Sequence, residues 1–499
     1  MAKPKLYRKS RVNKKRTFRR SFPSICDKNM SFQECELAIL RQAVDENEKA
    51  SKNKIANSDE VQKMVSIVED FLRSTKCICY GGTAINNILP EESQFYDKSI
   101  EIPDYDFFSK TPVKHAKQLA TIFHEQGYTE VEAKAGVHYG TYKVFVNFIP
   151  MADITMLHPK LYGNLQNEAI VINSIHYTPP NFLRMSMFLE LSRPQGDVSR
   201  WEKVLKRLTL LNQHYPLKAD KCHEIDFQRS LDHSPDDSSR LYSLVKDSFI
   251  DQRVVFFGGY ATSLYSRYMS SDQRRMVQSI PDFDVLSTDP DQCAQNVSAI
   301  LKQEGFSNVK IVKYKSVDEV IPEHYELLVG KDTLAFIYKP IACHNYNEIR
   351  LNKHQTVRVA TIDTILSFYL AFLYADMNYF GLYKDRLLCM SQFLFKVEQK
   401  NRLEQKGLLK RFTMTCYGTQ STLETIRAKK TEMFEALRNT KSDDPVKEAW
   451  FLKFNPATDF SKKSKQSRVS NRKNKKTRST QSQRKTRKNS KQKESEFFM

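Results

Sequence analysis

The sequence predicts an α/β protein in which one fold occurs twice along the chain. A pair of glycines follows a short apolar run at Gly81–Gly82 and again at Gly258–Gly259. Each pair is followed by an Asp-x-Asp segment, "IPDYDFFS" at 102–109 and "IPDFDVLS" at 280–287. The offset between the copies is 177 residues at the glycines and 178 at the acidic segments. Self-similarity over such a distance indicates a duplicated domain and excludes a short-period repeat.

The elements of the first copy follow in order along the chain. Apolar residues from Val61 to Leu72 recur at helical spacing and lead into a predicted strand, Cys77–Tyr80. The chain then turns at the glycine pair, because glycine adopts backbone angles that other residues avoid. The next segment, "TAINNIL", is predicted to be a helix that opens at the turn. A later strand is predicted at 144–157, and the second copy repeats the order from Leu241 onward.

Charge separates the two ends of the chain from its body. The net charge is +21, from 79 basic and 58 acidic residues among 499. Residues 1–20 carry +10 and residues 461–499 carry +13, which leaves the body at −2. Such basic, polar ends cannot form a core, so we expect them to be disordered and suited to a polyanion such as nucleic acid. A nuclear-targeting signal and a solubility tail remain alternatives.

Neither a membrane span nor a secretory signal is predicted. The longest near-continuous apolar stretch, at 365–375, is well short of the roughly 20 residues that cross a bilayer. The nine cysteines are odd in number, scattered, and include no CxxC pair that would suggest a zinc site. These features predict a reducing, intracellular protein whose cysteines are buried thiols.

Three aspartates predict a metal site in the first copy. Asp104 and Asp106 are two residues apart on a predicted strand, so both side chains point to one face. Asp153 lies among apolar residues of the later strand, where an unpaired charge is costly. Oxygen ligands of this type suit Mg²⁺, and three of them on adjacent strands could hold two ions about 3.5–4 Å apart. A lone Asp-x-Asp would more often be a solvated strand end.

The glycine turn supplies the remaining parts of a nucleotide site. Gly81 and Gly82 let backbone N–H groups approach phosphate oxygens, and the following helix points its N-terminus at them. Thr83 offers a hydroxyl group beside them. Together with the carboxylates, these residues predict a nucleotidyl-transfer site.

These motifs resemble those of the DNA polymerase β-like nucleotidyltransferases, and more narrowly the poly(A) polymerase catalytic subunit of large nucleocytoplasmic DNA viruses. The residues that carry the narrower resemblance are "YGGTAIN", "IPDYDFFS", "VHYGTYKVFVNFIPMADIT" and "GDVSRWEKVLKRL", and the resemblance covers roughly 55–400. It implies the mixed-sheet nucleotidyltransferase fold and addition of AMP from ATP to RNA 3′ ends with two Mg²⁺ or Mn²⁺ ions. It also implies a viral protein of the host cytoplasm or virus factory, possible virion packaging, and either a homodimer or a separate processivity subunit.

The resemblance also implies roles for particular residues. Asp104 and Asp106 would bind both metal ions, and Asp153 would bind one and help activate the 3′-hydroxyl. The triphosphate would be held by Gly81, Gly82 and Thr83. Three basic residues at helical spacing could reach the triphosphate or RNA, although a solvated helix face is the alternative: Arg200, Lys203 and Arg207.

The second copy is predicted to be inactive. It keeps Asp282 and Asp284, but alignment of the later strands places Phe336 where Asp153 stands, and Tyr260 replaces Thr83. Asp332 lies four residues from the aligned position and could supply the missing ligand if the register were different.

The sequence therefore predicts five segments. They are a basic N-terminal segment (1–50), a catalytic domain (51–220), a degenerate copy (235–350), a helical region (351–455) and a basic tail (456–499). Two other functions stay open: a terminal uridylyl or oligoadenylate-forming enzyme, and an RNA-binding scaffold without catalysis.

Overall fold

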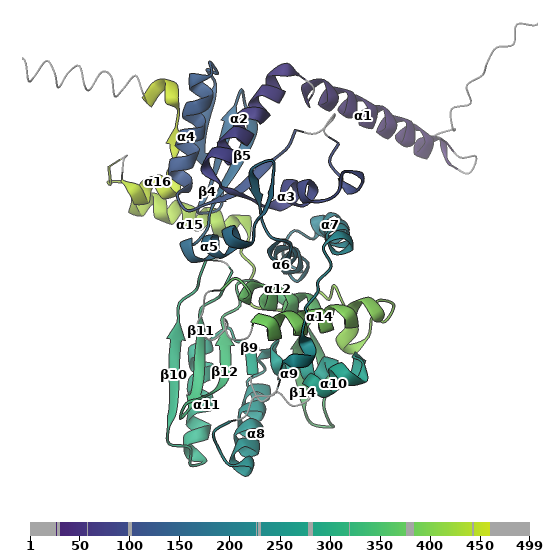
Figure 1. Cartoon of the computed structure of the whole chain (residues 1–499), viewed down its shortest axis with the longest axis vertical. Helices are drawn as coiled ribbons and strands as arrows, with labels where there is room; N and C mark the ends of the chain where they lie inside the picture. Colours follow the sequence, from purple (N-terminus) through teal and green to yellow (C-terminus); the bar gives the residue numbers. More distant parts are fainter. Residues whose placement is uncertain are drawn as a thin grey trace, which may run out of the picture. The chain divides into compact units, whose positions relative to one another are not determined.

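Figure 1 shows a computed structural model of the chain, which divides into two compact units. The smaller unit is Met1–Gln62 with Asp97–Ile102, and the larger is Lys63–Tyr96 with Pro103–Met499. The structure describes residues 26, 30–56, 58–97, 102–225, 227, 231–277, 283–318, 320–375, 384–441 and 444–459. The basic ends (1–20 and 461–499), predicted to be disordered, and Asp282 lie outside the described residues.

The smaller unit contains one long helix, α1 (Phe32–Ala56). Its start is capped by a reciprocal pair of hydrogen bonds. The Ser31 backbone N–H donates to the Glu34 carboxylate over 2.8 Å, and the Glu34 N–H donates to the Ser31 hydroxyl over 3.3 Å. This arrangement satisfies backbone donors that a helix leaves without partners at its first turn.

In the larger unit, the first copy is built on a mixed sheet of eight described strands, ordered β16-β3-β4-β5-β2-β1-β7-β6. Their bounds are β1 Ile78–Cys79, β2 Tyr105–Ser109, β3 Val131–Ala135, β4 Thr141–Val146, β5 Ile149–Met156, β6 Ile170–Ile172, β7 Ile175–Tyr177 and β16 Lys453–Phe454. The associated helices are α2 Asp59–Thr75, α3 Gly81–Ile88, α4 Pro112–Glu125, α5 Pro159–Glu168, α6 Pro180–Leu191 and α7 Trp201–His214.

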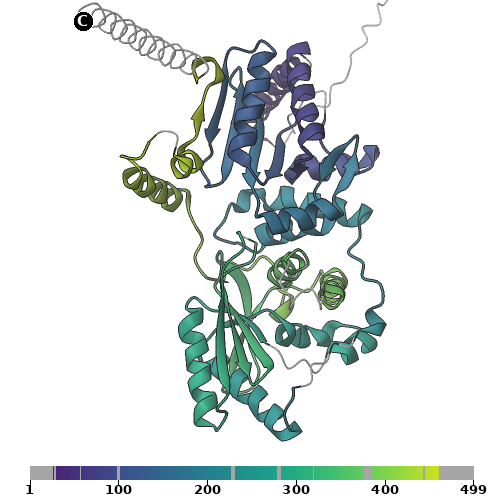
Figure 2. The same ribbon diagram turned by 60° about the vertical axis from the view of Figure 1, so that its left-hand side comes forward.

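Helices α2 and α4 cover one face of this sheet (Figure 2). On that face the Phe71 ring of α2 lies 6.1 Å from the Phe107 ring of β2, and the Tyr105 hydroxyl donates to Glu69. Tyr105 and Phe107 of β2 and Ala152 and Ile154 of β5 are buried, and successive residues of a strand point to opposite faces of the sheet. Alternation therefore places Asp106 and Asp153 on the opposite face.

The second copy has its own sheet of eight described strands, ordered β10-β11-β12-β9-β8-β14-β13-β15. Their bounds are β8 Val255–Phe256, β9 Phe283–Leu286, β10 Val309–Tyr314, β11 His324–Val329, β12 Asp332–Tyr338, β13 His344–Arg350, β14 Thr356–Ala360 and β15 Cys416–Tyr417. The helices of this copy are α8 Pro235–Asp251, α9 Gly259–Tyr265, α10 Ser271–Val277 and α11 Pro290–Gln303.

Strand pairing confirms the predicted duplication. In the first sheet β2 runs parallel to β5 and antiparallel to β1, and in the second β9 runs parallel to β12 and antiparallel to β8. A glycine turn and a helix follow β1 and β8 alike, at α3 and α9. The molecule is thus a duplicated α/β fold, as predicted.

The region from 351 to 455 contributes both helices and strands. Its helices are α12 Ile362–Phe372, α14 Lys384–Lys400, α15 Leu423–Ala436 and α16 Pro445–Phe451. Helix α12 packs beside α6 of the first copy (Figure 1), and the neighbouring Asn345 N–H donates to the Ser192 carbonyl over 2.9 Å. Three strands in the same region, β14, β15 and β16, complete the two sheets.

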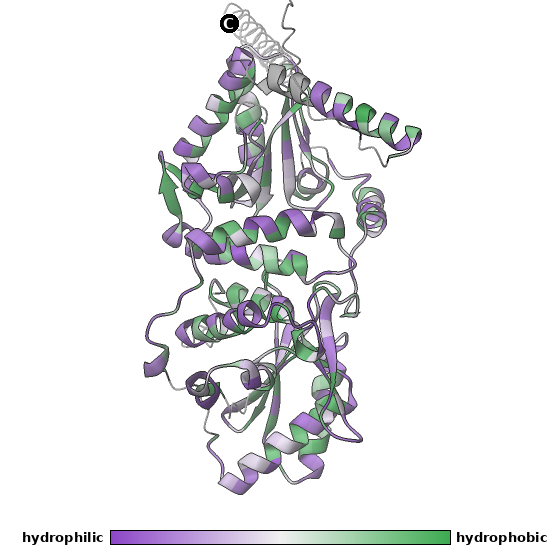
Figure 3. Ribbon diagram, turned by 90° about the vertical axis from the view of Figure 1, so that its right-hand side faces the viewer, coloured by the Kyte–Doolittle hydropathy of each residue, from purple (hydrophilic) through white to green (hydrophobic). Residues whose placement is uncertain are grey.

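The helices mix hydrophobic and hydrophilic residues along their length (Figure 3). In α4 and α11 the buried residues are mainly apolar, and in α12 every residue is buried. Helix α1 instead exposes Leu37, Leu40 and Val44. Among the described residues, no helix is both long enough and apolar enough to cross a bilayer.

The prediction that the cysteines are free thiols is wrong for six of them. The structure forms three disulfides, Cys26–Cys35, Cys222–Cys389 and Cys343–Cys416. Two of these join residues 167 and 73 positions apart, and such pairs cannot be read from sequence spacing. The three remaining cysteines, Cys77, Cys79 and Cys293, are buried thiols as expected.

Candidate active site

The three aspartates of the first copy meet on the face of the sheet that α2 and α4 leave uncovered. Strands β2 and β5 pair in register so that Asp106 lies directly opposite Asp153. Residues directly opposite one another on paired strands share a face. Asp104 precedes β2 by one residue and lies near enough to Asp153 for the two charges to interact. Two neighbouring strands thus bring together carboxylates that are 49 and 47 residues apart in sequence.

Mutual repulsion and burial raise the proton affinity of this cluster. Loss of hydration, with the nearby charges of Asp104 and Asp153, raises the pKa of Asp106 to about 7. Loss of hydration and the charge of Asp153 also raise the pKa of Asp104, although its side chain keeps contact with solvent. Carboxylates that resist ionisation in this way gain from a cation placed between them.

A lysine that sequence reasoning missed supplies one such cation. Lys143 lies opposite Asp153 on β4, and its ammonium group forms an ion pair with the Asp153 carboxylate. The charge of Lys143 also lowers the pKa values of Asp104 and Asp106 against the larger effect of burial. The alternating pattern of "TYKVFV" contains the signal, since it turns Lys143 away from the buried face.

The donor set fits hard divalent cations, which prefer carboxylate oxygens. Across the part of the chain that the structure describes, no three His, Cys, Asp or Glu side chains converge closely enough to hold one metal ion. In this cluster Asp153 forms an ion pair with Lys143 through Oδ2.

Gly81 leaves room for one of these carboxylates. Its φ of +72° lies in the left-handed region that side chains disfavour. A Cβ atom at this position would lie only 2.7 Å from Oδ2 of Asp106. The glycine is therefore needed twice, for the turn and for the approach of Asp106.

Gly82 faces a second set of polar groups. A Cβ atom there would lie 2.3 Å from the Tyr96 hydroxyl oxygen and 2.9 Å from both terminal nitrogens of Arg207. The Arg207 guanidinium donates to that hydroxyl over 2.7 Å and stacks above the rings of Phe95 and Tyr96. The turn thus presents its backbone beside a fixed cation, which suits an anionic group.

Thr83 has a hydrogen-bond partner within the protein. Its buried hydroxyl donates to the backbone carbonyl of Asp104 over 2.6 Å. The single hydroxyl hydrogen is used in that bond, so Thr83 ties the glycine turn to the segment that carries Asp104. Thr83 thus supports the carboxylate cluster through the backbone of Asp104.

The three predicted basic residues lie near the site, Arg200 directly before α7 and Lys203 and Arg207 within it. Lys203 lies close enough to lower the pKa of Asp104, and Arg200 does the same for Asp106. Arg200 is held by an ion pair with Glu190, with 3.2 Å between Nε and Oε1. With Arg207 beside Gly82, the structure brings every predicted site residue to one region of the first copy.

The second copy lacks this arrangement. Phe336 lies opposite Asp284, as Asp153 lies opposite Asp106, which agrees with the predicted alignment. Tyr260 is buried against the rings of Phe256 and Phe283. Asp332 is at the other end of β12, where its carboxylate accepts from the Asp232 N–H over 2.7 Å. Strand pairing puts Phe336, and not Asp332, beside Asp284. Asp332 therefore does not supply the carboxylate that Asp153 supplies in the first copy.

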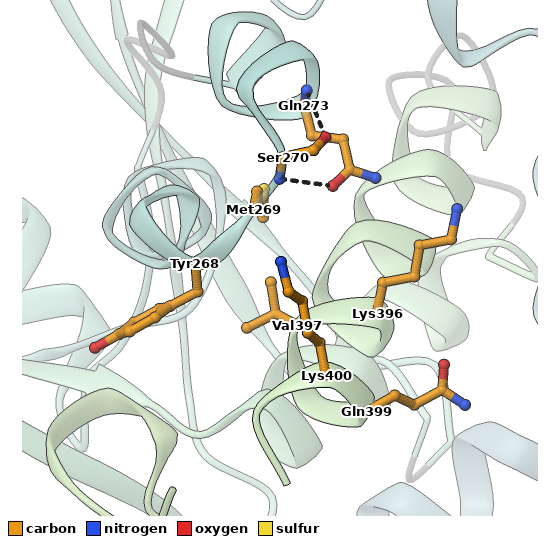
Figure 4. Close-up of a pocket in the computed structure, with 8 residues that line it drawn as sticks. All are labelled: Tyr268, Met269, Ser270, Gln273, Lys396, Val397, Gln399 and Lys400. Atoms are coloured by element: carbon orange, nitrogen blue, oxygen red, sulfur yellow. Dashed lines mark hydrogen bonds between the residues drawn. The ribbon is translucent and has the colours of Figure 1, made fainter.

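A cavity of about 470 Å³ lies away from these residues, between the second copy and α14 of the region that follows it (Figure 4). The second copy contributes the turn η4 (Ser266–Tyr268) and the start of α10. The residues that line it are Tyr268, Met269, Ser270, Gln273, Lys396, Val397, Gln399 and Lys400. Because none of them is acidic, this cavity is not a second carboxylate metal site.

The fold and the carboxylate cluster define a duplicated mixed α/β protein with one intact set of three aspartates. Comparison with known proteins shows which family the chain resembles. Residues 66–197 match the family described as "Poly(A) polymerase catalytic subunit". The chain also shares its fold with the crystal structure of the Megavirus polyadenylate synthase, with a TM-score of 0.72, 20% identity, and coverage of 87% of this chain and 89% of that one.

Relatives in large DNA viruses carry the same family name. A protein of Acanthamoeba polyphaga mimivirus, provisionally named a poly(A) polymerase catalytic subunit, is 27% identical over 289 residues, or 53% of this chain and 47% of its own length. A protein of African swine fever virus (strain Badajoz 1971 Vero-adapted) with the same provisional name is 29% identical over 168 residues, or 32% and 35%. This chain therefore spans about half of the first relative and a third of the second, and it resembles the viral poly(A) polymerase catalytic subunits.

Proposed function

We propose that the protein is a polynucleotide adenylyltransferase that adds AMP from ATP to RNA 3′ ends without a template. The observation that carries the proposal is the register of β2 and β5, which sets Asp106 opposite Asp153 and beside Asp104 in the first copy alone. The family match over 66–197 includes all three aspartates and supports the same reaction. In this proposal 51–220 is the catalytic domain and 235–350 is the degenerate copy.

The reaction joins the 3′-oxygen of RNA to the α-phosphorus of ATP, and the hydroxyl proton passes to the Asp153 carboxylate. The bond between the α-phosphorus and the oxygen that bridges to the β-phosphate breaks, and pyrophosphate leaves. Two Mg²⁺ or Mn²⁺ ions held by Asp104, Asp106 and Asp153 would lower the pKa of the attacking hydroxyl and offset charge on the triphosphate. The backbone N–H groups of Gly81 and Gly82 approach the phosphates at the start of α3.

Cationic side chains complete the nucleotide site. Arg207 lies against Gly82, and we assign it to the triphosphate. Lys203 lies near Asp104 and Arg200 near Asp106, where each offsets negative charge as ATP enters. Thr83 acts through the backbone of Asp104 and is therefore a positioning residue.

Incubation of the purified full chain with a labelled RNA primer and each nucleoside triphosphate in turn, with Mg²⁺ or Mn²⁺, tests the proposal. We expect extension with ATP and loss of extension in Asp104→Ala and Asp106→Ala. Extension with UTP in preference to ATP would indicate a terminal uridylyltransferase, and formation of short oligoadenylates without primer would indicate an oligoadenylate-forming enzyme. RNA binding with no extension by any nucleotide would favour the scaffold alternative.

Partners and location follow from the same resemblance. We propose a viral protein that acts in the host cytoplasm or virus factory, with packaging in the virion as an extension of that role. Processivity would come from a homodimer or from a separate subunit, in keeping with the "catalytic subunit" names of the relatives. Sedimentation of the full chain, alone and with RNA, distinguishes these two arrangements.

A further inference from the structure

We propose that RNA reaches Asp153 along a row of lysines on the uncovered face of β4, β3 and β16. The proposal rests on the proposed function for the identity of the polyanion. We define the lysine row as Lys143, Lys134 and Lys453. Asp153 lies opposite Lys143, Lys143 opposite Lys134, and Lys134 opposite Lys453, so four adjacent strands carry one in-register line.

Register fixes the face and the spacing of the row. Directly opposed residues share a face, so the three lysines lie on the face that carries Asp153. Neighbouring strands are about 4.8 Å apart, which spreads the lysines over roughly 10 Å, beginning about 5 Å from Asp153. The carboxylates are thus followed across the sheet by the lysine row. This order is expected if the 3′-hydroxyl of RNA lies at the aspartates and the preceding phosphates of RNA lie at the lysines.

The helix-covered face of these strands is occupied by core residues. Ala133 and Val144 alternate with the lysines and are fully buried. Phe454, next to Lys453, lies under the ammonium group of Lys117 from α4, 6.0 Å from the ring centroid. Lys453 is therefore turned away from α4, and it is exposed to solvent.

The second copy shows that the fold does not require cations at these positions. Its equivalent row runs Asp284, Phe336, Glu326 and Val312 across β9, β12, β11 and β10. Glu326 accepts hydrogen bonds from the Tyr314 and Thr333 hydroxyls in place of an ion pair. A cationic row beside the carboxylates is thus a property of the copy that keeps the three aspartates.

Two neighbours of Lys134 affect how this face would bind RNA. Its ammonium group lies 4.2 Å from the ring centroid of Phe145 and 3.1 Å from a carboxylate oxygen of Glu132. Phe145 and Glu132 are directly opposed and lie on the same face as the row. A half-buried aromatic ring beside a cation can bind a stacked base and the phosphate next to it. The negative charge of Glu132, in contrast, repels a polyanion.

The row also leads toward the basic tail in sequence. Strand β16 ends at Phe454, and residues 461–499 carry a net charge of +13. An RNA chain that follows the row from Asp153 to Lys453 thus reaches β16, the strand that precedes the basic tail in the sequence. Single-stranded RNA is the polyanion that this arrangement favours, because the Phe145 ring beside Lys134 offers a surface on which an unpaired base can stack.

Binding of a fluorescein-labelled 15-nucleotide oligoadenylate to the full chain, measured by anisotropy without ATP over a range of salt concentrations, tests the row. We expect Lys134→Gln with Lys453→Gln to weaken binding about five- to tenfold and to lower the salt slope by about 1.4, because each phosphate contact on single strands contributes about 0.7. Glu132→Gln should tighten binding. The matched control is Lys310→Gln, an exposed lysine on β10, the counterpart of β3.

The outcomes separate this proposal from the proposed function. A salt slope unchanged in the double variant, or a change equal to that of the Lys310 control, overturns the lysine row even if ATP is polymerised. A lowered slope in a protein that extends no primer upholds the row and counts against adenylyl transfer. In an active enzyme, the double variant should raise KM for RNA while KM for ATP stays unchanged.

Discussion

At the scale of single residues, the site depends on a glycine that leaves space for an acidic side chain. Asp106 approaches Gly81 so closely that only a hydrogen fits between backbone and carboxylate. The same relation recurs in the second copy, where Asp284 lies against Gly258. The repeated glycine therefore makes room for an aspartate in both copies, and the residue opposite that aspartate distinguishes them.

Gly81→Ala should reduce turnover at least tenfold, because its methyl group would displace the Asp106 carboxylate. Gly127→Ala is the matched control, since Gly127 also has a positive φ, +96°, and a Cβ atom there would meet no heavy atom within 4 Å. Both variants should lose about 1 kcal/mol of stability from backbone strain. Steady-state kinetics and thermal melts check the pair, and equal turnover in the two would contradict the steric role of Gly81.

Asp153→Asn should abolish activity, with a loss of at least about a hundredfold, because a neutral amide neither balances metal charge nor accepts a proton as a carboxylate does. Asp282→Ala combined with Asp284→Ala should leave turnover largely intact, since Phe336 stands opposite Asp284. Primer extension by both proteins, with folding verified by a cooperative melt, makes the comparison. The assignment is falsified if the folded double variant is as inactive as Asp153→Asn.

At the scale of elements, helices α12 and α14 are joined by a buried group of charges. The Arg411 guanidinium donates to both carboxylate oxygens of Asp363, over 2.6 and 3.0 Å, and lies 2.7 Å from Glu398. One cation thus faces two buried carboxylates. Burial and the charge of Asp363 raise the pKa of Glu398 to about 8, so the folded protein holds a proton there at neutral pH.

Glu398→Gln should remove a pH dependence of stability. Between the ordinary pKa of glutamate, near 4.5, and about 8, the folded state binds a proton that the unfolded state has lost. The free energy of unfolding therefore falls as pH rises through this range, by on the order of 2 kcal/mol. Urea unfolding at several pH values measures the slope in both proteins.

Asp363→Asn is the companion variant for that experiment. It removes the carboxylate that Arg411 bonds twice, so it should destabilise the protein at every pH. A Glu398→Gln protein that keeps the full pH slope of the parent would show that other groups cause it.

At the scale of the whole molecule, the first sheet is completed by the far end of the chain. Strand β16 pairs with β3 although more than 300 residues separate them, and Lys117 of α4 forms an ion pair with Glu448 of α16 over 2.5 Å. The segment before the basic tail is thereby part of the same sheet as the three aspartates.

Deletion of residues 461–499 should weaken RNA binding and flatten its salt dependence, because fewer counterions are released when the tail is absent. Turnover at saturating RNA should change little, since the deletion leaves β16 and the carboxylates in place. Binding isotherms at several salt concentrations provide the measurement. If the slope of log affinity against log salt stays unchanged, the tail serves another purpose, such as targeting.

The sequence by itself determined the features that local patterns encode. The two glycine turns, the paired aspartates and the alternating strands predicted a duplicated α/β fold, because each is a short-range requirement of backbone geometry or side-chain period. The alignment of Phe336 with Asp153 followed from the same repeat, and the strand register bears it out.

Only the tertiary structure decided which distant residues meet. Lys143 became part of the site through pairing of β4 with β5, and Lys453 joined the lysine row through pairing of β16 with β3. The Cys222–Cys389 disulfide likewise joins residues 167 positions apart. Strand order and long-range contacts depend on how apolar faces pack together, which no short stretch of sequence specifies.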